Sequence, residues 1–132
     1  MYLIDTNILS YFIRQNQDII NQFNIYSDQI ILSTVVEMEC FFGAEKANQL
    51  ELIDIYKEIF ATYPSLTFDS KAARIFGKIK SKCQKSGKNI EDFDLMLAAQ
   101  ALAHNLILVT NNVKHFKNID GLMIEDWSKL KL

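Results

Sequence analysis

Three acidic residues lie where short apolar segments end or where the following helices begin. Asp5 comes directly after the apolar segment 2–4, Glu39 lies in a helical segment after the apolar segment 30–32, and Asp94 lies in the first turns of a later helical segment. Ligands gather outside the carboxyl ends of parallel strands, so these positions can converge on one cleft. Carboxylates held close together repel one another and raise each other's pKa, which favours a bound cation that neutralises them.

Oxygen ligands alone would surround that cation, since no His or Cys accompanies the three acids. Hard carboxylate oxygens favour Mg²⁺ or Mn²⁺ over Zn²⁺. Ions held in this way position phosphate oxygens and water for in-line attack, often as a pair about 3.5–4 Å apart. The three acids therefore predict metal-dependent chemistry at a phosphate group.

Asp5 by itself supports two interpretations. It precedes a predicted helix over 7–14, where an Asp is as consistent with a helix N-cap as with an active-site acid. Thr6 and Asn7 can cap the same helix. Together with Glu39 and Asp94, Asp5 can bind a metal ion. We therefore expect Thr6 and Asn7 to cap the helix, which leaves the Asp5 carboxylate free for the ion.

Glu37 and Glu39 lie only two residues apart, so they point to different sides of their helix. Glu37 has capping-box spacing from Thr34, which predicts a structural role. Gly43 follows Glu39 by one turn and leaves open space beside it. This space favours Glu39 as the site residue.

The remaining acids near these motifs have positions that favour structural roles. Asp92 cannot share a helix face with Asp94, and it stabilises the helix macrodipole from the first turn. Asp69 is predicted to cap the helix that follows it, and Glu125 and Asp126 are predicted to be exposed.

The histidines and cysteines do not form a catalytic or metal-binding pattern. His104 and His115 are far apart in the sequence, and neither has a nucleophile partner. We expect a structural role for His104. For His115 contact with the substrate is an alternative, but a structural role is favoured. Cys40 and Cys83 have no metal or redox spacing. They are predicted to be buried, reduced thiols, which is consistent with a cytoplasmic protein.

The elements that position these residues alternate between short apolar runs and helical periodicity. Strands are predicted at 2–4, 30–32, 66–69, 106–110 and 122–124. Helices are predicted at 7–14, 18–26, 34–46, 47–63, 70–85 and 91–104, with a helical turn up to residue 116. This alternation predicts an α/β fold with a central, mostly parallel sheet of four to five short strands flanked by helices.

Composition is that of an ordered globular protein, with 49% hydrophobic and 23% charged residues in a chain of 132. The length and the lack of repeats or linkers predict one domain over residues 1–132. The N-terminus lacks the basic region of a signal peptide, and no run approaches ~18 apolar residues. The net charge of −2 supplies no global field for nucleic acid, so polyanion binding requires local clustering.

Six short motifs follow one another along the chain: YLIDTN at 2–7, ECFFGAEK at 39–46, FDLMLAA at 93–99, LVTNN at 108–112, HF at 115–116 and EDW at 125–127. Each motif alone is weak. Their ordered combination covers essentially the whole chain and resembles the PIN domains, more specifically the VapC-type toxin ribonucleases of VapBC systems. The fold that this resemblance implies is the three-layer PIN-like fold.

The resemblance implies a Mg²⁺- or Mn²⁺-dependent endoribonuclease that inhibits translation and that a cognate VapB-like antitoxin holds in check. The substrate would be tRNA or rRNA, and the assembly a homodimer or a toxin–antitoxin heteromer. The metal ligands would be Asp5, Glu39 and Asp94. Thr6 matches a hydroxyl that borders the site, and Asn112 occupies a fourth position that is often Asp.

Asn112 has a consequence for the number of ions. Three carboxylates supply three negative charges, which one Mg²⁺ largely balances and two would exceed. We hypothesise that the free enzyme holds one ion well, and that a second binds weakly or arrives with the substrate phosphate. Asn112 would then orient water or the second ion through its amide oxygen.

Basic residues are concentrated in one predicted helix. Seven of the fourteen Lys and Arg residues fall between 71 and 88. At 3.6 residues per turn, five of them form a strip beside the apolar face: Lys71, Arg74, Lys78, Lys82 and Lys85. A solvated surface is the commoner fate of such residues, but their concentration favours RNA contact.

Three other functions use similar residues. A receiver-like domain that accepts a phosphoryl group needs an acid beside Asp5 and a Lys at a late strand end, where the sequence has Thr110-Asn111-Asn112. A haloacid-dehalogenase-type phosphatase needs an Asp where Asn7 stands. A PIN-like module that only binds protein partners is disfavoured by the three acids.

Overall fold

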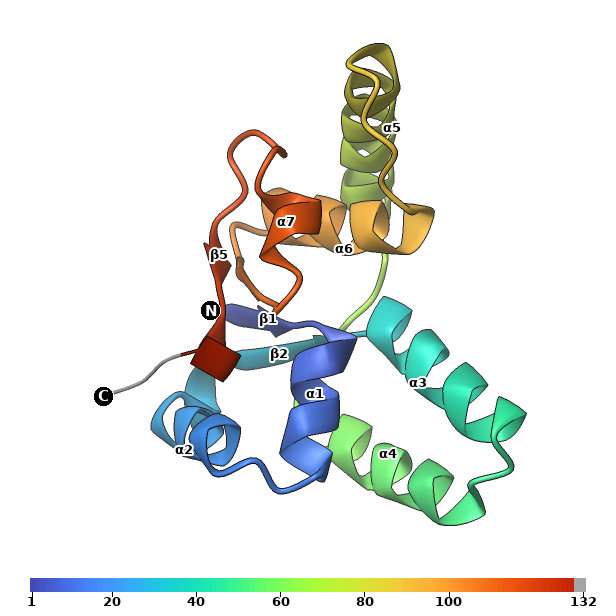
Figure 1. Cartoon of the computed structure of the whole chain (residues 1–132), viewed down its shortest axis with the longest axis vertical. Coiled ribbons are helices and arrows are strands. Elements are labelled where there is room, and N and C mark those ends of the chain that lie inside the picture. The colour runs from blue at the N-terminus through green and yellow to red at the C-terminus, as the bar shows by residue number, and fades with distance from the viewer. Residues whose placement is uncertain (130–132) are drawn as a thin grey trace.

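The computed structural model of the chain describes residues 1–129 (Figure 1). Its centre is one sheet of five short strands, all parallel, in the order β3-β2-β1-β4-β5. The strands are β1 (Tyr2–Ile4), β2 (Ile30–Ser33), β3 (Ser65–Leu66), β4 (Ile107–Val109) and β5 (Ile124–Glu125). The prediction of an α/β fold with a central parallel sheet is confirmed.

Seven helices flank this sheet in two layers. They are α1 (Thr6–Ile13), α2 (Gln17–Ile25), α3 (Thr34–Lys46), α4 (Leu50–Thr62), α5 (Ser70–Lys85), α6 (Asp92–Ala103) and α7 (Val113–Phe116). Figure 1 shows α5, α6 and α7 on one side of the sheet and α1 to α4 on the other. Short 3₁₀ turns at Ser27–Gln29 and Trp127–Lys129 complete the described chain.

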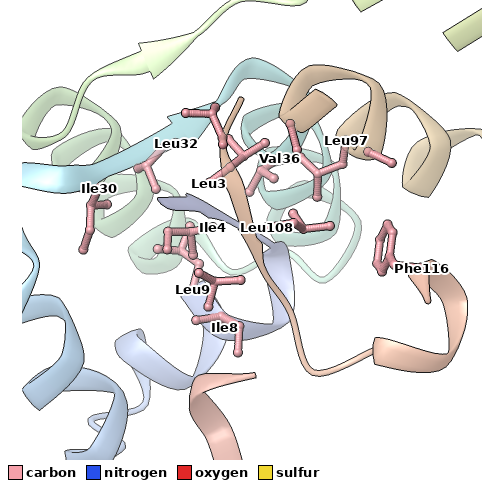
Figure 2. Packing of buried hydrophobic residues seen from close by; sticks show 14 of the residues in the cluster. Leu3, Ile4, Ile8, Leu9, Ile30, Leu32, Val36, Leu97, Leu108 and Phe116 are labelled. Carbon is pink, nitrogen blue, oxygen red and sulfur yellow. The ribbon is translucent and has the colours of Figure 1, made fainter. Parts of the chain in front are cut away.

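The core explains why β1 reads as an apolar run without alternation. As the central strand it is covered on both faces, and Leu3 and Ile4 are fully buried. Leu9 of α1, Leu108 of β4 and Phe116 of α7 pack into the same core (Figure 2). Burial of this kind holds β1 and β4, and hence their carboxyl ends, in a fixed position.

Several predicted boundaries differ from the structure. The helix expected over 47–63 begins only at Leu50, because Ala47 ends α3 and Asn48 turns the chain with a φ of 54°. The strand expected at 66–69 is the two-residue edge strand β3, since the chain leaves β2 after Leu66 so that Asp69 can cap α5.

The capping box expected from Thr34 and Glu37 is wrong. Ser33 is the N-cap of α3, and its hydroxyl accepts a hydrogen bond from the Val35 backbone N at 3.0 Å. The Thr34 hydroxyl instead donates to the Leu66 carbonyl at 3.4 Å. Thr34 therefore fastens α3 to the edge strand rather than capping the helix.

Over the described part of the chain, no helix combines the length and the apolar character needed to cross a bilayer.

Candidate active site

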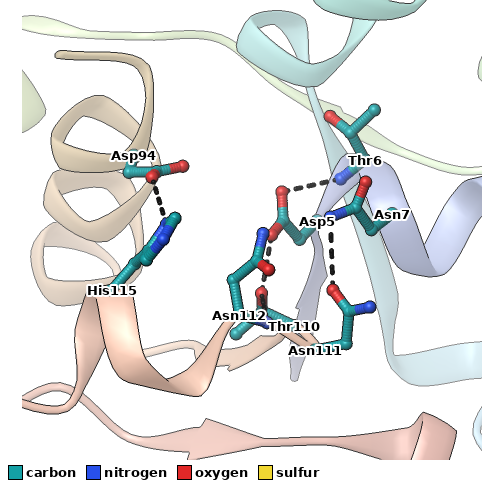
Figure 3. Close-up of polar contacts among 8 residues, drawn as sticks. All are labelled: Asp5, Thr6, Asn7, Asp94, Thr110, Asn111, Asn112 and His115. Atoms are coloured by element: carbon teal, nitrogen blue, oxygen red, sulfur yellow. Dashed lines mark hydrogen bonds and ion pairs between the residues drawn. The ribbon is translucent and has the colours of Figure 1, made fainter. Parts of the chain in front are cut away.

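The carboxylate of Asp5 lies directly after β1, at the N-terminus of α1. Only 3% of the residue is exposed. Its Oδ1 accepts a hydrogen bond from the Thr6 backbone N at 2.7 Å, and its Oδ2 accepts one from the Thr110 hydroxyl at 2.6 Å (Figure 3). Asp5 is thus the N-cap itself, which corrects the expectation that Thr6 and Asn7 cap the helix.

The parallel register of β1 and β4 brings Thr110 to Asp5. Ile4 lies opposite Val109, and the Asp5 backbone N donates to the Val109 carbonyl at 2.9 Å. The next residue, Thr110, is fully buried, and its hydroxyl also accepts from the Asn112 backbone N at 3.0 Å. One buried hydroxyl therefore links the Asp5 carboxylate to the loop that carries Asn112.

Burial raises the pKa of Asp5, while the hydrogen bonds from Thr110 and Thr6 oppose that rise. Repulsion by the carboxylates of Asp94 and Glu39 raises the same pKa further. The three acids come from the end of β1, from α3 and from α6, yet Glu39 and Asp94 both lie within electrostatic reach of Asp5.

Asp94 faces the site from the first turn of α6. Its side chain is 13% exposed, and its Oδ2 lies 3.1 Å from Nδ1 of His115 on α7 (Figure 3). Burial raises the pKa of Asp94, the contact with His115 opposes the rise, and repulsion by Glu91 adds to it. His115 therefore holds the Asp94 carboxylate in one orientation.

Glu39 is exposed on α3, and the open space expected near it is present. A Cβ built on Gly43, one turn later, meets no atom within 4 Å. Among residues 1–129, no three Asp, Glu, His or Cys side chains converge closely enough to form a finished metal cage. Because Glu39 is long and solvent-exposed, its side chain can turn toward Asp5 without disturbing the core.

The donor set fits a hard divalent cation. Asp5, Glu39 and Asp94 offer carboxylate oxygens only, which suits Mg²⁺ or Mn²⁺. The hydroxyl of Thr6, the residue after Asp5, is buried and has no hydrogen-bond partner within the described chain. An orphaned buried oxygen one residue from a carboxylate is the kind of group that a bound water satisfies.

Asparagine side chains from α1 and from the loop after β4 border one side of the site (Figure 3). Nδ2 of Asn7 donates to Oδ1 of Asn111 at 3.2 Å, and Nδ2 of Asn111 donates to the Tyr11 hydroxyl at 3.4 Å. The half-buried Asn112 side chain makes no hydrogen bond to the described residues, and in Figure 3 it lies between Asp5 and His115. Its amide is available to a ligand.

The basic strip lies on α5, as its spacing predicts. All five members are exposed: Lys71, Arg74, Lys78, Lys82 and Lys85. Lys82 forms an ion pair with Asp120, whereas the other four form none with residues 1–129. Lys80, beside the strip, forms an ion pair with Asp92 at 2.8 Å. Asp92 therefore faces α5 and does not share the direction of Asp94.

The acids near the C-terminus are not the exposed groups that were expected. Glu125 is half-buried, and its Oε1 accepts a hydrogen bond from Nε1 of the fully buried Trp127 at 3.1 Å. Asp126 accepts from the Ser128 backbone N at 2.9 Å. Both acids fix the last turn of the described chain.

Other structural assignments agree with the sequence. Asp69 caps α5 by accepting from the Ala72 backbone N at 2.9 Å, and its Oδ2 lies 2.9 Å from Nε2 of His104. Cys40 and Cys83 are buried and free. Burial raises the pKa of the Cys40 thiol to about 12, so it stays protonated at neutral pH.

Two residues of the site escaped the sequence analysis. Thr110 follows β4 as Asp5 follows β1, so the pairing of two central parallel strands was a usable signal for their contact. His115 was assigned a structural role because no partner was visible in the sequence. The helical turn that carries it brings it to Asp94 only in the folded chain.

Comparison with known proteins gives consistent results. A model of the PIN domain family matches residues 2–122. The chain is 34% identical to ribonuclease VapC2 of Haemophilus influenzae, over 96% of this chain and 97% of the relative. It is 32% identical to the tRNA(fMet)-specific endonuclease VapC of Shigella flexneri, over 96% and 98%.

The fold agrees as closely as the sequence. A chain in the crystal structure of DNA-bound VapBC from Salmonella typhimurium superposes with a TM-score of 0.89 at 29% identity, covering 96% of this chain and 97% of that one. The family match spans Asp5, Glu39, Asp94 and Asn112. The chain belongs to the PIN-domain family and, within it, to the VapC ribonucleases.

Proposed function

We propose that this chain, acting as a single PIN-like domain, is the toxin of a toxin–antitoxin pair and cleaves phosphodiester bonds in RNA with Mg²⁺ or Mn²⁺. The observation that carries the proposal is the buried Asp5 carboxylate, whose pKa is raised further by the carboxylates of Asp94 and Glu39. The Haemophilus relative is likewise named a ribonuclease.

The substrate class that we propose is tRNA, with ribosomal RNA as the second candidate. The Shigella relative is named for cleavage of tRNA(fMet), and it matches this chain over nearly its full length. Cleavage of either RNA would inhibit translation, and it would take place in the cytoplasm.

In this proposal Asp5, Glu39 and Asp94 hold the ion. A bound divalent cation supplies a water of lowered pKa and neutralises charge on the scissile phosphate. The Thr110 hydroxyl and the Thr6 backbone N hold the Asp5 carboxylate in one rotamer. Nδ1 of His115 does the same for Asp94.

Asn112 sets the expected number of ions. With an amide at the fourth position, the site carries three negative charges, so we propose one tight site and a second that fills only with the substrate phosphate. The unpaired Asn112 amide would orient water or the second ion. Calorimetric titration without RNA is expected to give one tight site, and two equally tight sites would contradict this.

A cognate VapB-like antitoxin is the proposed protein partner, in a heteromer that contains this chain or a dimer of it. The Salmonella chain that superposes on this one was crystallised as a VapBC complex. Co-purification with the product of an adjacent small reading frame, and loss of cleavage in that complex, are the expected results.

The RNA is proposed to contact the basic strip on α5. Phosphate contacts of Lys and Arg supply most non-specific affinity for nucleic acids and make it salt-dependent. Four strip members are exposed and form no ion pair within residues 1–129, so their charge is available: Lys71, Arg74, Lys78 and Lys85.

The decisive experiment incubates purified protein with total tRNA and rRNA, with either Mg²⁺ or EDTA. Wild-type protein is expected to cleave only with Mg²⁺. Asp5→Asn and Asp94→Asn are expected to abolish cleavage. The matched control is Asp92→Asn, because Asp92 lies on the same helix as Asp94 but pairs with Lys80.

Cleavage that survives both EDTA and Asp5→Asn would overturn the metal mechanism. Equal loss in Asp92→Asn and Asp94→Asn would show damage to α6 rather than loss of a ligand. An RNA pool left intact by wild-type protein in Mg²⁺ would revive the non-catalytic and phosphoryl-accepting alternatives.

A further inference from the structure

A cavity of about 240 Å³ opens beside Asp94. One wall is the loop between α5 and α6, with Lys88, Asn89 and Glu91, and the other comes from α7 and the turn after it. Lys114 and His115 belong to this second wall, and Asp94 lines the same space. The cavity therefore touches both a proposed metal ligand and the residue that orients it.

Lys88 is fixed in the cavity by the way α5 ends. Gly87 adopts a left-handed φ of 72°, and the Lys88 backbone N donates to the Cys83 carbonyl at 2.8 Å, as in a Schellman motif. From there Nζ of Lys88 reaches the Asn118 carbonyl, at 3.4 Å. A neutral acceptor thus holds the ammonium group across the cavity, while Lys88 acts on the Asp120 carboxylate only at long range, by lowering its pKa.

The two lysines of this cavity differ from Lys80 and Lys82, the α5 lysines that form ion pairs. Lys80 pairs with Asp92 and Lys82 with Asp120. Lys88 and Lys114 are exposed and form no ion pair with any residue from 1 to 129. Positive charge that faces a cavity without a carboxylate partner is suited to an anionic ligand.

A second cavity continues the first toward the basic strip. It measures about 160 Å³ and shares Lys88 and Asn118 with the first. Its other lining residues include Lys78 and Lys82 of the strip. The hollow therefore leads from Asp94, past Lys88, to the middle of α5.

We infer that the cavity beside Asp94 is a subsite for the nucleotide next to the scissile phosphate, and that Lys88 and Lys114 bind its phosphate. The inference rests on the proposed ribonuclease function. It gives the RNA strand a path over the protein surface, from the metal site across the α5–α6 loop toward Lys78. The side-chain amides of Asn89 and Asn118 add hydrogen-bonding groups that can read a base edge.

Glu91 is the opposing charge in this subsite. It is exposed, lines the same cavity, and repels the Asp94 carboxylate. It would repel a phosphate in the same way. The inference therefore predicts effects of opposite sign for the lysines and for Glu91.

The test measures RNA binding separately from cleavage, in the Asp5→Asn background, with a fluorescein-labelled oligouridylate and with tRNA as probes. Adding Lys88→Gln and Lys114→Gln is expected to weaken binding roughly tenfold and to reduce the slope of log K against log salt by about 1.4, or 0.7 per lost single-strand contact. Adding Glu91→Gln instead is expected to tighten binding.

The matched control is Lys46→Gln with Lys57→Gln, which removes the same charge from the α3–α4 hairpin, away from the cavity (Figure 1). It is expected to leave binding unchanged. Lys88→Arg with Lys114→Arg is expected to restore it. Equal weakening in the control and the Lys88/Lys114 pair would reduce the effect to net charge and overturn the subsite, as would unchanged binding in the pair.

Failure of the subsite and failure of the proposed function give different results. Wild-type cleavage together with lysine-independent binding rejects only the subsite. Lysine-dependent binding without wild-type cleavage rejects the nuclease proposal and keeps the RNA site. Absence of any RNA binding rejects both.

Discussion

At the scale of single residues, Asp5 combines two roles that a sequence presents as alternatives. Its carboxylate caps α1 by accepting from the Thr6 backbone N, and the same carboxylate belongs to the acidic site, with only 3% of the residue exposed. In an Asn side chain the amide oxygen can accept from the Thr6 backbone N, and Nδ2 can donate to the Thr110 hydroxyl oxygen. The cap and the charge are therefore separable by mutation.

Asp5→Asn is expected to make the metal-free protein as stable as wild type or more stable. Because the folded-state pKa of Asp5 is raised, the folded protein holds this proton over a window that starts near the unfolded value of about 3.9. Stability is thus lost as pH rises through that window and stays lower above it. Urea unfolding in EDTA at neutral pH measures the difference, which should vanish below the unfolded pKa.

A lower stability for Asp5→Asn than for wild type in EDTA would mean that the carboxylate, as a cap, contributes more than its burial costs. The fold would then depend on the charge that the site also uses. Such a result would make loss of cleavage in this variant uninformative, and Asp94→Asn would carry the test of the site alone.

Thr110→Val is expected to destabilise the protein by about 1–3 kcal/mol, because it removes the hydrogen-bond partner of Oδ2 of the buried Asp5 and that of the Asn112 backbone N. Thr110→Ser is the control, since it keeps the hydroxyl and removes only a methyl group. Urea denaturation of both variants distinguishes a lost hydrogen bond from altered packing. A loss in Thr110→Ser as large as that in Thr110→Val would show that packing of the methyl group contributes as much to stability as the hydrogen bonds of the hydroxyl.

Site residues could be predicted from the sequence where the residues around them in the chain form a recognisable motif. Asp5, Glu39 and Asp94 stand in recognisable local motifs, so their approach to one sheet edge could be predicted. The contact of His115 with Asp94 could not, since it depends on how α7 packs against α6. Glu125 was misjudged although its partner Trp127 lies only two residues away, because the burial of that tryptophan depends on the folded core.

At the scale of elements, local signals decided which boundaries were predictable. The range of α5 was predicted as Ser70–Lys85, because a capping Asp69 precedes it and Gly87 follows it. Between α3 and α4 no Gly or Pro marks the turn, and Asn48 makes it with a positive φ instead. The sequence therefore placed the start of α4 too early.

Charge reversal at two lysines of the basic strip on α5 is expected to have unequal effects on RNA binding. Lys78 forms no ion pair within the described chain, whereas Lys82 pairs with Asp120. Lys78→Glu should therefore weaken tRNA binding more than Lys82→Glu, and it should lower the salt dependence more. Fluorescence anisotropy over a series of salt concentrations gives both quantities. Equal effects would show that the Lys82–Asp120 pair opens when RNA binds.

At the scale of the whole molecule, the site exists only because of the strand order. β1 lies between β2 and β4, so the segments that leave their carboxyl ends bring Glu39, Asp5 and Thr110 to one edge. Alternating strands and helices predicted a parallel sheet, but that pattern does not state which strands are neighbours. The order came from packing that involves the entire core.

Magnesium is expected to raise the melting temperature of wild-type protein but not that of Asp5→Asn. A ligand that binds only the folded state stabilises it by about 1.4 kcal/mol for each tenfold rise in concentration above Kd. Thermal scans over a Mg²⁺ series check this without any RNA, with Asp92→Asn as the variant that should respond like wild type. A full response in Asp5→Asn would place the ion elsewhere.

The aromatic packing at the far end of β1 supplies a built-in optical reporter. Trp127 is the only tryptophan in the chain, it is fully buried, and its ring centroid lies 5.2 Å from that of Tyr2. Tyr2 begins the strand that Asp5 follows, so the tyrosine that packs against the fluorophore lies roughly 10 Å along the strand from Asp5. Its emission should report global unfolding and remain silent to a cation arriving at the other end.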